Sequence, residues 1–287
     1  MTNKIELFKA YIPLIDEVYK TASLTSILDG PAELIQETQQ AGEFLIPKMD
    51  MDGLADYSRG DGYAQGSVSL TYETKKANYD RARKFSVNAM DNVETAGIAF
   101  GKLSSEFMRT KAVPELDAFR FASYAKAAKT VKTGALADGK AWLEAVSEAN
   151  VALSNAEVST ENRILYISPA GLEAINNLDT IASRAALARF AQIIETPQPR
   201  FASAIKLLSG KESESAGGFK KDDAGKDINF LIVQKDAVIQ FTKNVVSKVI
   251  TPEENQNDDA WLFFFHLYGI AENYDNKKDG IYVHTVA

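Results

Sequence analysis

A long β-hairpin with a polar tip is the feature that most constrains what this chain can fold into. Residues 68–72 alternate strictly between apolar and polar side chains, which is the period of a half-buried strand. Residues 43–51 form a second strand candidate, and Pro47 restricts it to a sheet edge. Residues 52–66 between them are rich in Gly and Asp, so residues 42–91 are predicted to form an extended loop built on a hairpin. A lone hairpin is marginal in water and must therefore lie on another surface.

Helical spacing replaces this alternation after residue 91. Either one kinked helix or two helices that meet near Val113-Pro114 are predicted over 92–129, because proline removes a helical hydrogen bond. A second helix follows an Asp138 cap, and a short buried strand at residues 163–167 runs into a third helix with Ser168 at its N-cap. Further strands are predicted at residues 230–233, 237–241, 261–268 and 281–286. The chain is therefore predicted to be α+β, without an internal repeat.

Two segments are less regular. Residues 1–41 are predicted to be an N-terminal arm that begins with a short amphipathic helix. Residues 210–227 contain Phe219 as their one large apolar side chain. Such a composition buries too little apolar surface to offset the entropy lost on ordering, so this segment is predicted to be a mobile surface loop.

The charge balance and the missing cysteines exclude several classes of protein. The 287 residues include 32 Lys and Arg against 39 Asp and Glu, a net charge of −7, which argues against a dedicated binder of nucleic acid or anionic membranes. Without cysteine there are no disulfides, thiolate metal sites or thiol nucleophiles. The most apolar stretch, residues 261–271, is shorter than the about 20 residues of a membrane span. We expect a soluble protein, made inside the cell.

Few residues are suited to catalysis. His266 and His284 are the two histidines, so three histidines cannot ligate a metal within one chain, although a single Ser–His–Asp arrangement stays arithmetically possible. His266 stands among phenylalanines and is predicted to be packed in the core. No catalytic, metal or cofactor site is expected.

One segment imitates a nucleotide-binding motif. Residues 134–140 have the Gly-x-x-x-x-Gly-Lys spacing of a phosphate-binding loop. Ala141 stands where a Ser or Thr hydroxyl would bind Mg²⁺, and residues 128–133 are too polar for the expected strand. The segment is interpreted as a glycine linker into a helix, and a nucleotide-binding enzyme using Gly134 to Lys140 is the less favoured alternative.

A local basic cluster follows the second hairpin strand. Its members are Lys75, Lys76, Arg81, Arg83 and Lys84. The default interpretation is a solvated face or a set of ion pairs between subunits. From the residues alone, an assembling structural protein explains the protruding hairpin and the missing chemistry better than an enzyme does.

Several short motifs resemble those of tailed-bacteriophage major capsid proteins. They lie in order along most of the chain: Gly53-Leu-Ala-Asp56-Tyr57-Ser58-Arg59 with Gly62-Tyr63, Asp80-Arg81 with Phe85 to Asp91, Val113-Pro-Glu-Leu-Asp-Ala-Phe-Arg-Phe121, and Arg163 to Pro169. Asn88 departs from the Asp that is commoner in that group.

The resemblance implies the phage major capsid fold. Its parts would be an N-terminal arm (1–41), an extended loop (42–91), a peripheral domain with a long spine helix (92–132), an axial domain (133–250) and C-terminal strands that return to the peripheral domain (251–287). It also implies self-assembly of pentamers and hexamers into an icosahedral head around phage double-stranded DNA.

The implied partners are further copies of the chain, portal and scaffolding proteins, and packaged DNA bound only non-specifically, with no membrane. The implied location is the virion, assembled in the host bacterial cytoplasm. The subunit-interface candidates are Asp56, Tyr57, Arg59, Tyr63, Asp80 and Arg81. The main alternative is another virion protein of the tail or scaffold, although a scaffold would be largely helical.

Overall fold

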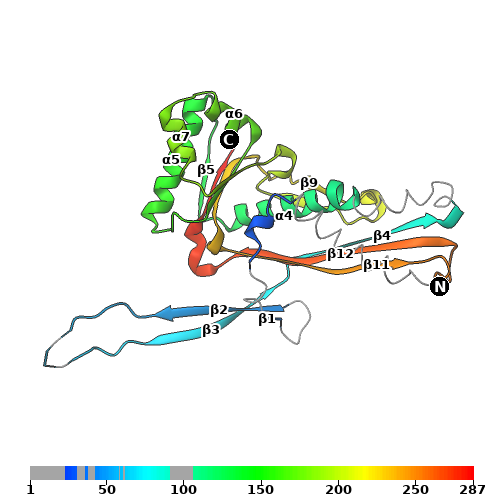
Figure 1. Ribbon diagram of the computed structural model, residues 1–287, viewed down its shortest axis with the longest axis horizontal. Coiled ribbons are helices and arrows are strands. Elements are labelled where there is room, and N and C mark those ends of the chain that lie inside the picture. The colour runs from blue at the N-terminus through cyan, green and yellow to red at the C-terminus, as the bar shows by residue number, and fades with distance from the viewer. Residues whose placement is uncertain (1–22, 31–35, 38–42, 58, 61, 91–105) are drawn as a thin grey trace.

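The computed structural model describes residues 23–30, 36–37, 43–57, 59–60, 62–90 and 106–287. The amphipathic helix expected at the start of the arm lies outside these residues, as does the first part of the helical segment predicted over 92–129. The described chain forms a body with two main sheets and an arm that extends away from it (Figure 1).

The first sheet is long, antiparallel and three-stranded. It is ordered β11 (Val238–Ile250), β12 (Ala260–Asn273), β4 (Tyr79–Asn88). Helix α4 (Val113–Ala127) lies over one face of it (Figure 1). Alternate residues of β12, namely Phe263, Phe265 and Leu267, point to that face and pack with Val113 and Leu116. The period of two in β12 thus supplies the core between helix and sheet.

A π-helical turn directly precedes the helix that contains Pro114. Residues Met108–Ala112 form this turn, and the N–H of Val113 bonds to the carbonyl of Met108, five residues back. Pro114 has no N–H to place in the next turn, and the wider spacing absorbs that loss. The irregularity therefore falls where proline predicts it, as a π-helical turn that passes into α4 at Val113.

The second sheet is five-stranded and carries helices on one face. The order is β5 (Thr130–Thr133), β13 (Ile281–Thr285), β10 (Ile228–Gln234), β6 (Arg163–Ile167), β7 (Gln192–Glu195). On one face α5 (Gly139–Asn155), α6 (Pro169–Asn176) and α7 (Ile181–Leu187) gather around Trp142 and Phe230 (Figure 1). On the other face Phe121 and Tyr124 of α4 pack against Tyr166. Helix α4 therefore joins the two cores.

The predicted helix caps are confirmed. The Asp138 carboxylate accepts the N–H of Ala141 at 2.8 Å, where α5 begins. The Ser168 hydroxyl accepts the N–H of Gly171 at the start of α6, with proline as the first helical residue. Both satisfy donors that a helix leaves unpaired at its N-terminus.

The arm is the predicted hairpin. Strands β2 (Glu43–Met51) and β3 (Val68–Lys76) pair along their whole length. The short β1 (Gln36–Glu37) pairs with β2 only at Phe44 and Leu45. Among the described residues, β1 covers this edge of β2 only at Phe44 and Leu45, and Pro47, which has no N–H to donate, lies further along the strand.

Strand pairing divides the chain differently from the predicted domain ranges. Strand β4 was expected within the extended loop and β11 within the axial domain, yet both pair with β12. Strand β13 was expected to return with β12 to the peripheral domain, but it pairs with β10 and β5 in the five-stranded sheet. The pairings of β4 with β12 and of β13 with β10 and β5 join segments far apart in sequence, which local patterns do not encode, whereas β11 and β12 are consecutive strands.

The segment 210–227, predicted to be a mobile loop, contains regular structure. Strands β8 (Ile205–Leu207) and β9 (Phe219–Lys221) form a small hairpin around a short helical turn, Glu212–Glu214. The Glu214 carboxylate accepts bonds from the Lys206 ammonium and the Ser209 N–H, both at 2.8 Å, and these lower the pKa of Glu214 to about 2. Polar bonds hold this segment in place of the apolar burial that it lacks.

Candidate interaction surfaces

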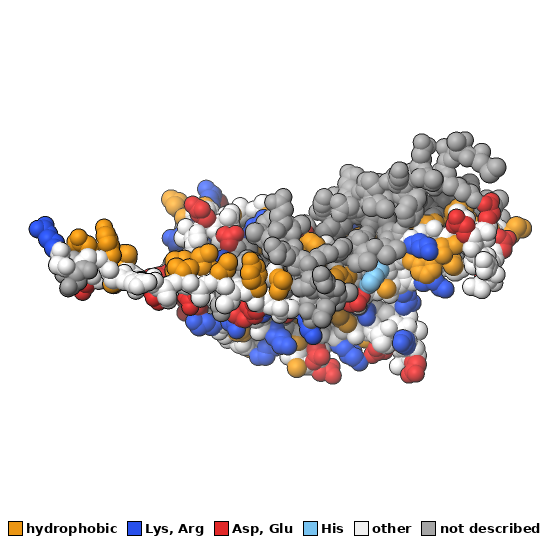
Figure 2. Space-filling model, turned by 90° about the horizontal axis from the view of Figure 1, so that it is seen from below, with side chains coloured by type: hydrophobic (Ala, Val, Ile, Leu, Met, Phe, Trp, Pro, Cys, Tyr) orange, Lys and Arg blue, Asp and Glu red, His pale blue; other side chains and the backbone are white. Residues whose placement is uncertain are grey.

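The hairpin has one apolar face and one polar face. Met49 lies opposite Leu70, and Met51 lies opposite Val68, and residues directly opposite in an antiparallel pair share a face. These four side chains and that of Tyr72 are between 53% and 71% exposed. The alternate residues Asp50, Ser69 and Thr71 point to the other side. Figure 2 shows the apolar side chains as a continuous row along the arm.

This row is left uncovered by the described part of the chain. Single exposed apolar residues are ordinary, but a contiguous row marks an interaction surface. We call it the apolar face of the hairpin, defined by Met49, Met51, Val68, Leu70 and Tyr72.

The tip contains four of the predicted interface residues. The rings of Tyr57 and Tyr63 lie with their centroids 5.0 Å apart, and both residues are exposed. Asp56 and Arg59 are also exposed, and neither bonds to any residue that the structure describes. The tip is closed by Asp52, whose carboxylate accepts the N–H of Ser67 at 2.7 Å, and this bond lowers the pKa of Asp52.

The other two predicted interface residues bond within their own subunit. Asp80 Oδ1 lies 2.6 Å from His266 Nε2 on the face of the long sheet away from α4, so the prediction of a core His266 is wrong. Arg81 Nε donates to Glu115 at 2.7 Å, and its Nη2 donates to the carbonyls of Leu208 and Gly218 at 2.8 and 3.3 Å. Arg81 thereby joins β4, α4 and the β8–β9 hairpin.

The base of the arm is fixed to the body. Lys75 Nζ lies 2.8 Å from Glu73, 3.5 Å from Glu272 and 3.4 Å from Asp275. The Asn78 side chain donates to the carbonyl of Ala271 and accepts its N–H, at 2.9 and 3.1 Å. Lys75, expected on a solvated face or at a subunit interface, therefore helps to set the direction in which the arm leaves the body.

The Val-Pro-Glu-Leu-Asp motif supplies buried polar residues to the junction of several elements. Asp117 is fully buried and accepts bonds from Ser23 Oγ at 2.8 Å and from Thr25 Oγ1 at 2.6 Å. Arg120, also fully buried, donates to Thr25 Oγ1 at 2.8 Å and lies 3.3 Å from Asp29. Alternation and spacing in the sequence do not reveal this role. Charged residues within a helix that also has a core-facing apolar stripe are a sequence signal of buried polar contacts.

The candidate nucleotide loop, residues 134–140, has a structural role. A Cβ on Gly139 would overlap the carbonyl oxygen of Ala174, so glycine allows α5 to approach α6. Lys140 is exposed and lies 3.7 Å from Glu144, one turn along the same helix. Residues 130–133, judged too polar for a strand, form β5 at the sheet edge, parallel to β13, where polar side chains are tolerated. The interpretation as a linker into a helix agrees with this geometry.

The described residues provide neither a metal-binding cluster nor a membrane-spanning helix. In those ranges no three His, Asp or Glu side chains gather in a way that could hold a metal ion. No helix formed by the same residues is long and apolar enough to cross a membrane.

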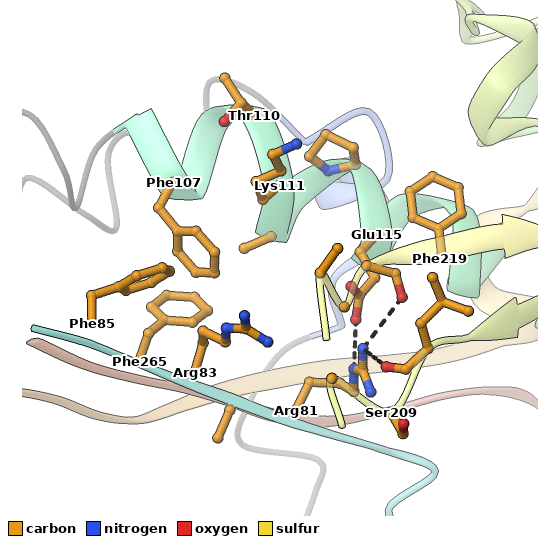
Figure 3. Close-up of a pocket in the computed structure, with 18 of the residues that line it drawn as sticks. Arg81, Arg83, Phe85, Phe107, Thr110, Lys111, Glu115, Ser209, Phe219 and Phe265 are labelled. Carbon is orange, nitrogen blue, oxygen red and sulfur yellow. Dashed lines mark hydrogen bonds and ion pairs between the residues drawn. The ribbon is translucent and has the colours of Figure 1, made fainter. Parts of the chain in front are cut away.

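A cavity of about 470 Å³ lies between β4, the π-helical turn and the β8–β9 hairpin (Figure 3). Phe85, Phe107 and Phe265 form one wall, with the Phe85 and Phe107 rings edge to face at 4.7 Å. Arg83 and Lys111 also line the cavity, and in Figure 3 the end of the Lys111 side chain points away from the three phenylalanines. We call this the spine-helix cavity.

Protein-family profiles and curated protein sequences do not match the chain. Solved structures do. A virus-like particle from Pyrococcus furiosus has 13% identity and a TM-score of 0.57, with 97% of this chain and 99% of that chain covered. The capsid of Staphylococcus phage Andhra has 12% identity and a TM-score of 0.57, with coverage of 89% and 84%.

The chain has the phage capsid fold. The mature capsid of bacteriophage PhiM1 matches in the same way, at 12% identity and a TM-score of 0.54, with 87% and 83% covered. The predicted α+β phage capsid fold is therefore confirmed over most of the chain. The three-stranded and five-stranded sheets also contradict a largely helical scaffold protein.

Proposed function

We propose that this chain is the major capsid protein of a tailed bacteriophage, which assembles with further copies of itself into a closed icosahedral shell around double-stranded DNA. The observation that carries the proposal is the apolar face of the hairpin, which the described residues leave exposed in a chain with the phage capsid fold.

The apolar face supplies the driving force for assembly. At roughly 25 cal/mol per Å² of apolar surface, burying five half-exposed large side chains contributes several kcal/mol to each contact between copies. The same contact is repeated by every subunit, so individually weak interfaces sum to a stable closed shell. The bonded base at Lys75 and Asn78 presents the arm in one direction, which limits the orientations that each contact must fix.

The rest of the molecule suits a container. The net charge of −7 limits attraction to packaged DNA, which is held without specific contacts. The proposal assigns no catalytic turnover and no cofactor to the chain. Its partners are other copies in pentamers and hexamers, with portal and scaffolding proteins, and its place is the virion after assembly in the host cytoplasm.

A paired substitution on the hairpin tests the proposal. Leu70→Glu places a charge on the apolar face, whereas Ser69→Glu places the same charge on the polar face of the same strand. Sedimentation velocity of the purified full chain should show large particles for the wild type and for Ser69→Glu, and subunits for Leu70→Glu, with equal melting temperatures. Equal particle yields from both variants, or no particles from the wild type, would contradict the proposal.

A further inference from the structure

We propose that the spine-helix cavity binds a small monocarboxylic acid with a phenyl-sized apolar tail, its carboxylate on Arg83 and its tail against the phenylalanine wall. The site lies within one subunit, so the inference goes beyond the proposed function and does not depend on assembly.

Strand register places the cation beside the aromatic wall. Arg83 of β4 lies directly opposite Phe265 of β12. Residues directly opposite in an antiparallel pair share a face of the sheet, and here it is the face toward α4. In Figure 3 the Arg83 guanidinium lies next to Phe265, on the side of the phenylalanines that faces Glu115. An occupant of the cavity therefore meets a cation and an aromatic surface together.

The described residues leave the charge of Arg83 uncompensated. Its Nη2 donates to the carbonyl of Ser215 at 2.9 Å, which is a neutral acceptor, and Arg83 forms no ion pair with any residue that the structure describes. Arg81 differs, because its Nε lies 2.7 Å from the Glu115 carboxylate. A partly enclosed guanidinium without an anion favours a carboxylate, which can accept two of its N–H groups at once.

A single negative charge suits this cavity. The end of the Lys111 side chain points away from the three phenylalanines in Figure 3, so Arg83 is the cation beside the wall. The Glu115 carboxylate also lines the cavity and would repel a second negative charge on the ligand. A monocarboxylate therefore fits better than a doubly charged phosphate.

The aromatic wall fits an apolar tail of phenyl size. Phe107 lies edge to face with Phe85 at 4.7 Å and with Phe265 at 5.2 Å. A further ring can join this cluster in the same geometry, which aromatic pairs prefer. The volume of about 470 Å³ lies in the range of pockets that hold small organic molecules.

Two glycines and the π-helical turn shape the opposite sides of the cavity. A Cβ on Gly210 would lie 2.9 Å from Arg83 Nη1, and one on Gly217 would lie 3.3 Å from it. Glycine therefore lets the backbone of the β8–β9 hairpin approach the guanidinium without filling the space. Thr110 and Ala112 of the π-helical turn line the other side. Such turns are rare and occur frequently at functional sites.

Calorimetric titration of the full chain with 4-phenylbutanoate tests the site. The acid should bind saturably and raise the melting temperature. The amide 4-phenylbutanamide has the same shape without the charge and should bind at least about tenfold more weakly. Arg83→Met keeps the apolar length of the side chain but removes the guanidinium, so it should weaken binding of the acid by about tenfold or more and leave binding of the amide unchanged.

Controls separate this site from general charge effects and from loss of folding. Arg189→Met removes an exposed arginine outside the cavity and should leave binding unchanged. Ala216→Trp adds bulk at an exposed position of the lining and should weaken binding of acid and amide alike. Inorganic phosphate at the same concentration should not displace the acid.

Four outcomes would overturn the inference. These are no saturable binding to the wild type, equal binding of acid and amide, full binding by folded Arg83→Met, and displacement by inorganic phosphate. If Arg83→Met fails to fold, the comparison of acid with amide and the Ala216→Trp variant decide instead. Particle formation is not measured here, so failure of this inference leaves the proposed function standing.

Discussion

Thr25 Oγ1 donates a hydrogen bond to Asp117 Oδ1 at 2.6 Å, and this bond ties the segment before the arm to the spine helix α4. The same carboxylate accepts the N–H of Leu24 at 3.1 Å, and Arg200 Nη1 lies 3.5 Å from it. One fully buried side chain thereby joins three parts of the chain. Bonds from several donors, together with a cation, compensate the cost of burying its charge.

Asp117→Ala should therefore destabilise the subunit strongly. Removing the carboxylate leaves buried donors unsatisfied and Arg200 without its partner, which should cost about 3 kcal/mol or more. Urea unfolding of the purified subunit measures this loss. Glu173→Ala, at an exposed position of α6, serves as the control and should change stability by less than about 0.5 kcal/mol. If both variants lose a similar free energy of unfolding, Asp117 does not have the structural role described here.

Lys75→Met should affect assembly more than folding. Methionine keeps the apolar length of the side chain but leaves Glu73, Glu272 and Asp275 without their shared cation, so the direction of the arm is no longer fixed. The loss of stability should stay below about 1 kcal/mol, because the pairs are partly exposed. Shell yield should fall, whereas Lys220→Met on the exposed face of β9 should leave it unchanged. If Lys75→Met forms normal shells, contacts other than these ion pairs fix the direction of the arm.

Gly139→Ala should destabilise the subunit by roughly 1–3 kcal/mol, because the new methyl group overlaps backbone of α6. Gly53→Ala is the matched control, since a Cβ there meets no atom within 4 Å.

Adding Mg²⁺ and ATP should leave the melting temperature of the wild type unchanged, because a ligand that binds the native state would raise it. A nucleotide-dependent rise that Lys140→Ala abolishes would instead favour the enzyme alternative.

His284 should make stability depend on pH in a defined direction. Burial lowers the pKa of His284, and its Nδ1 lies 3.0 Å from Asn229 Nδ2. Because the folded state favours the neutral ring, this contribution is complete above the unfolded pKa of about 6.5 and is lost as the pH falls through the lower folded value. The free energy of unfolding of the wild type should fall more steeply below about pH 6.5 than that of His284→Gln. Parallel pH profiles would contradict this assignment.

Deleting residues 54–64 and closing the gap with glycines should prevent assembly but not folding. The tip has exposed side chains and no part in the cores of the body, so its loss should change the melting temperature little. Arg59→Glu is the milder version and should lower shell yield by reversing one exposed charge. If the deletion variant fails to fold, the tip belongs to the core of the subunit. If the deletion variant forms normal shells, the tip is not part of the interface between subunits.

Local patterns predict the features of this fold that depend on neighbouring residues. The alternation at Val68, Leu70 and Tyr72 predicts both the strand and its apolar face, because successive side chains of a strand point in opposite directions. The caps at Asp138 and Ser168 are equally local and are confirmed.

Features that depend on distant pairing could not be predicted in this way. Arg81 belongs to a basic cluster in sequence, but its partners Glu115, Leu208 and Gly218 come from other elements. The segment 210–227 looks mobile by composition because the bonds that hold it come largely from Arg83 and from its own Glu214. A buried charge such as Asp117 is recognisable only once the segments around it are placed.

Electron microscopy of the purified full-length chain tests the central claim most directly. If copies of this chain close into a shell through the hairpin, the wild type should form closed particles of uniform diameter, and the 54–64 deletion should give only subunits at the same concentration. Open tubes, or wild-type protein that stays as folded subunits, would contradict the account.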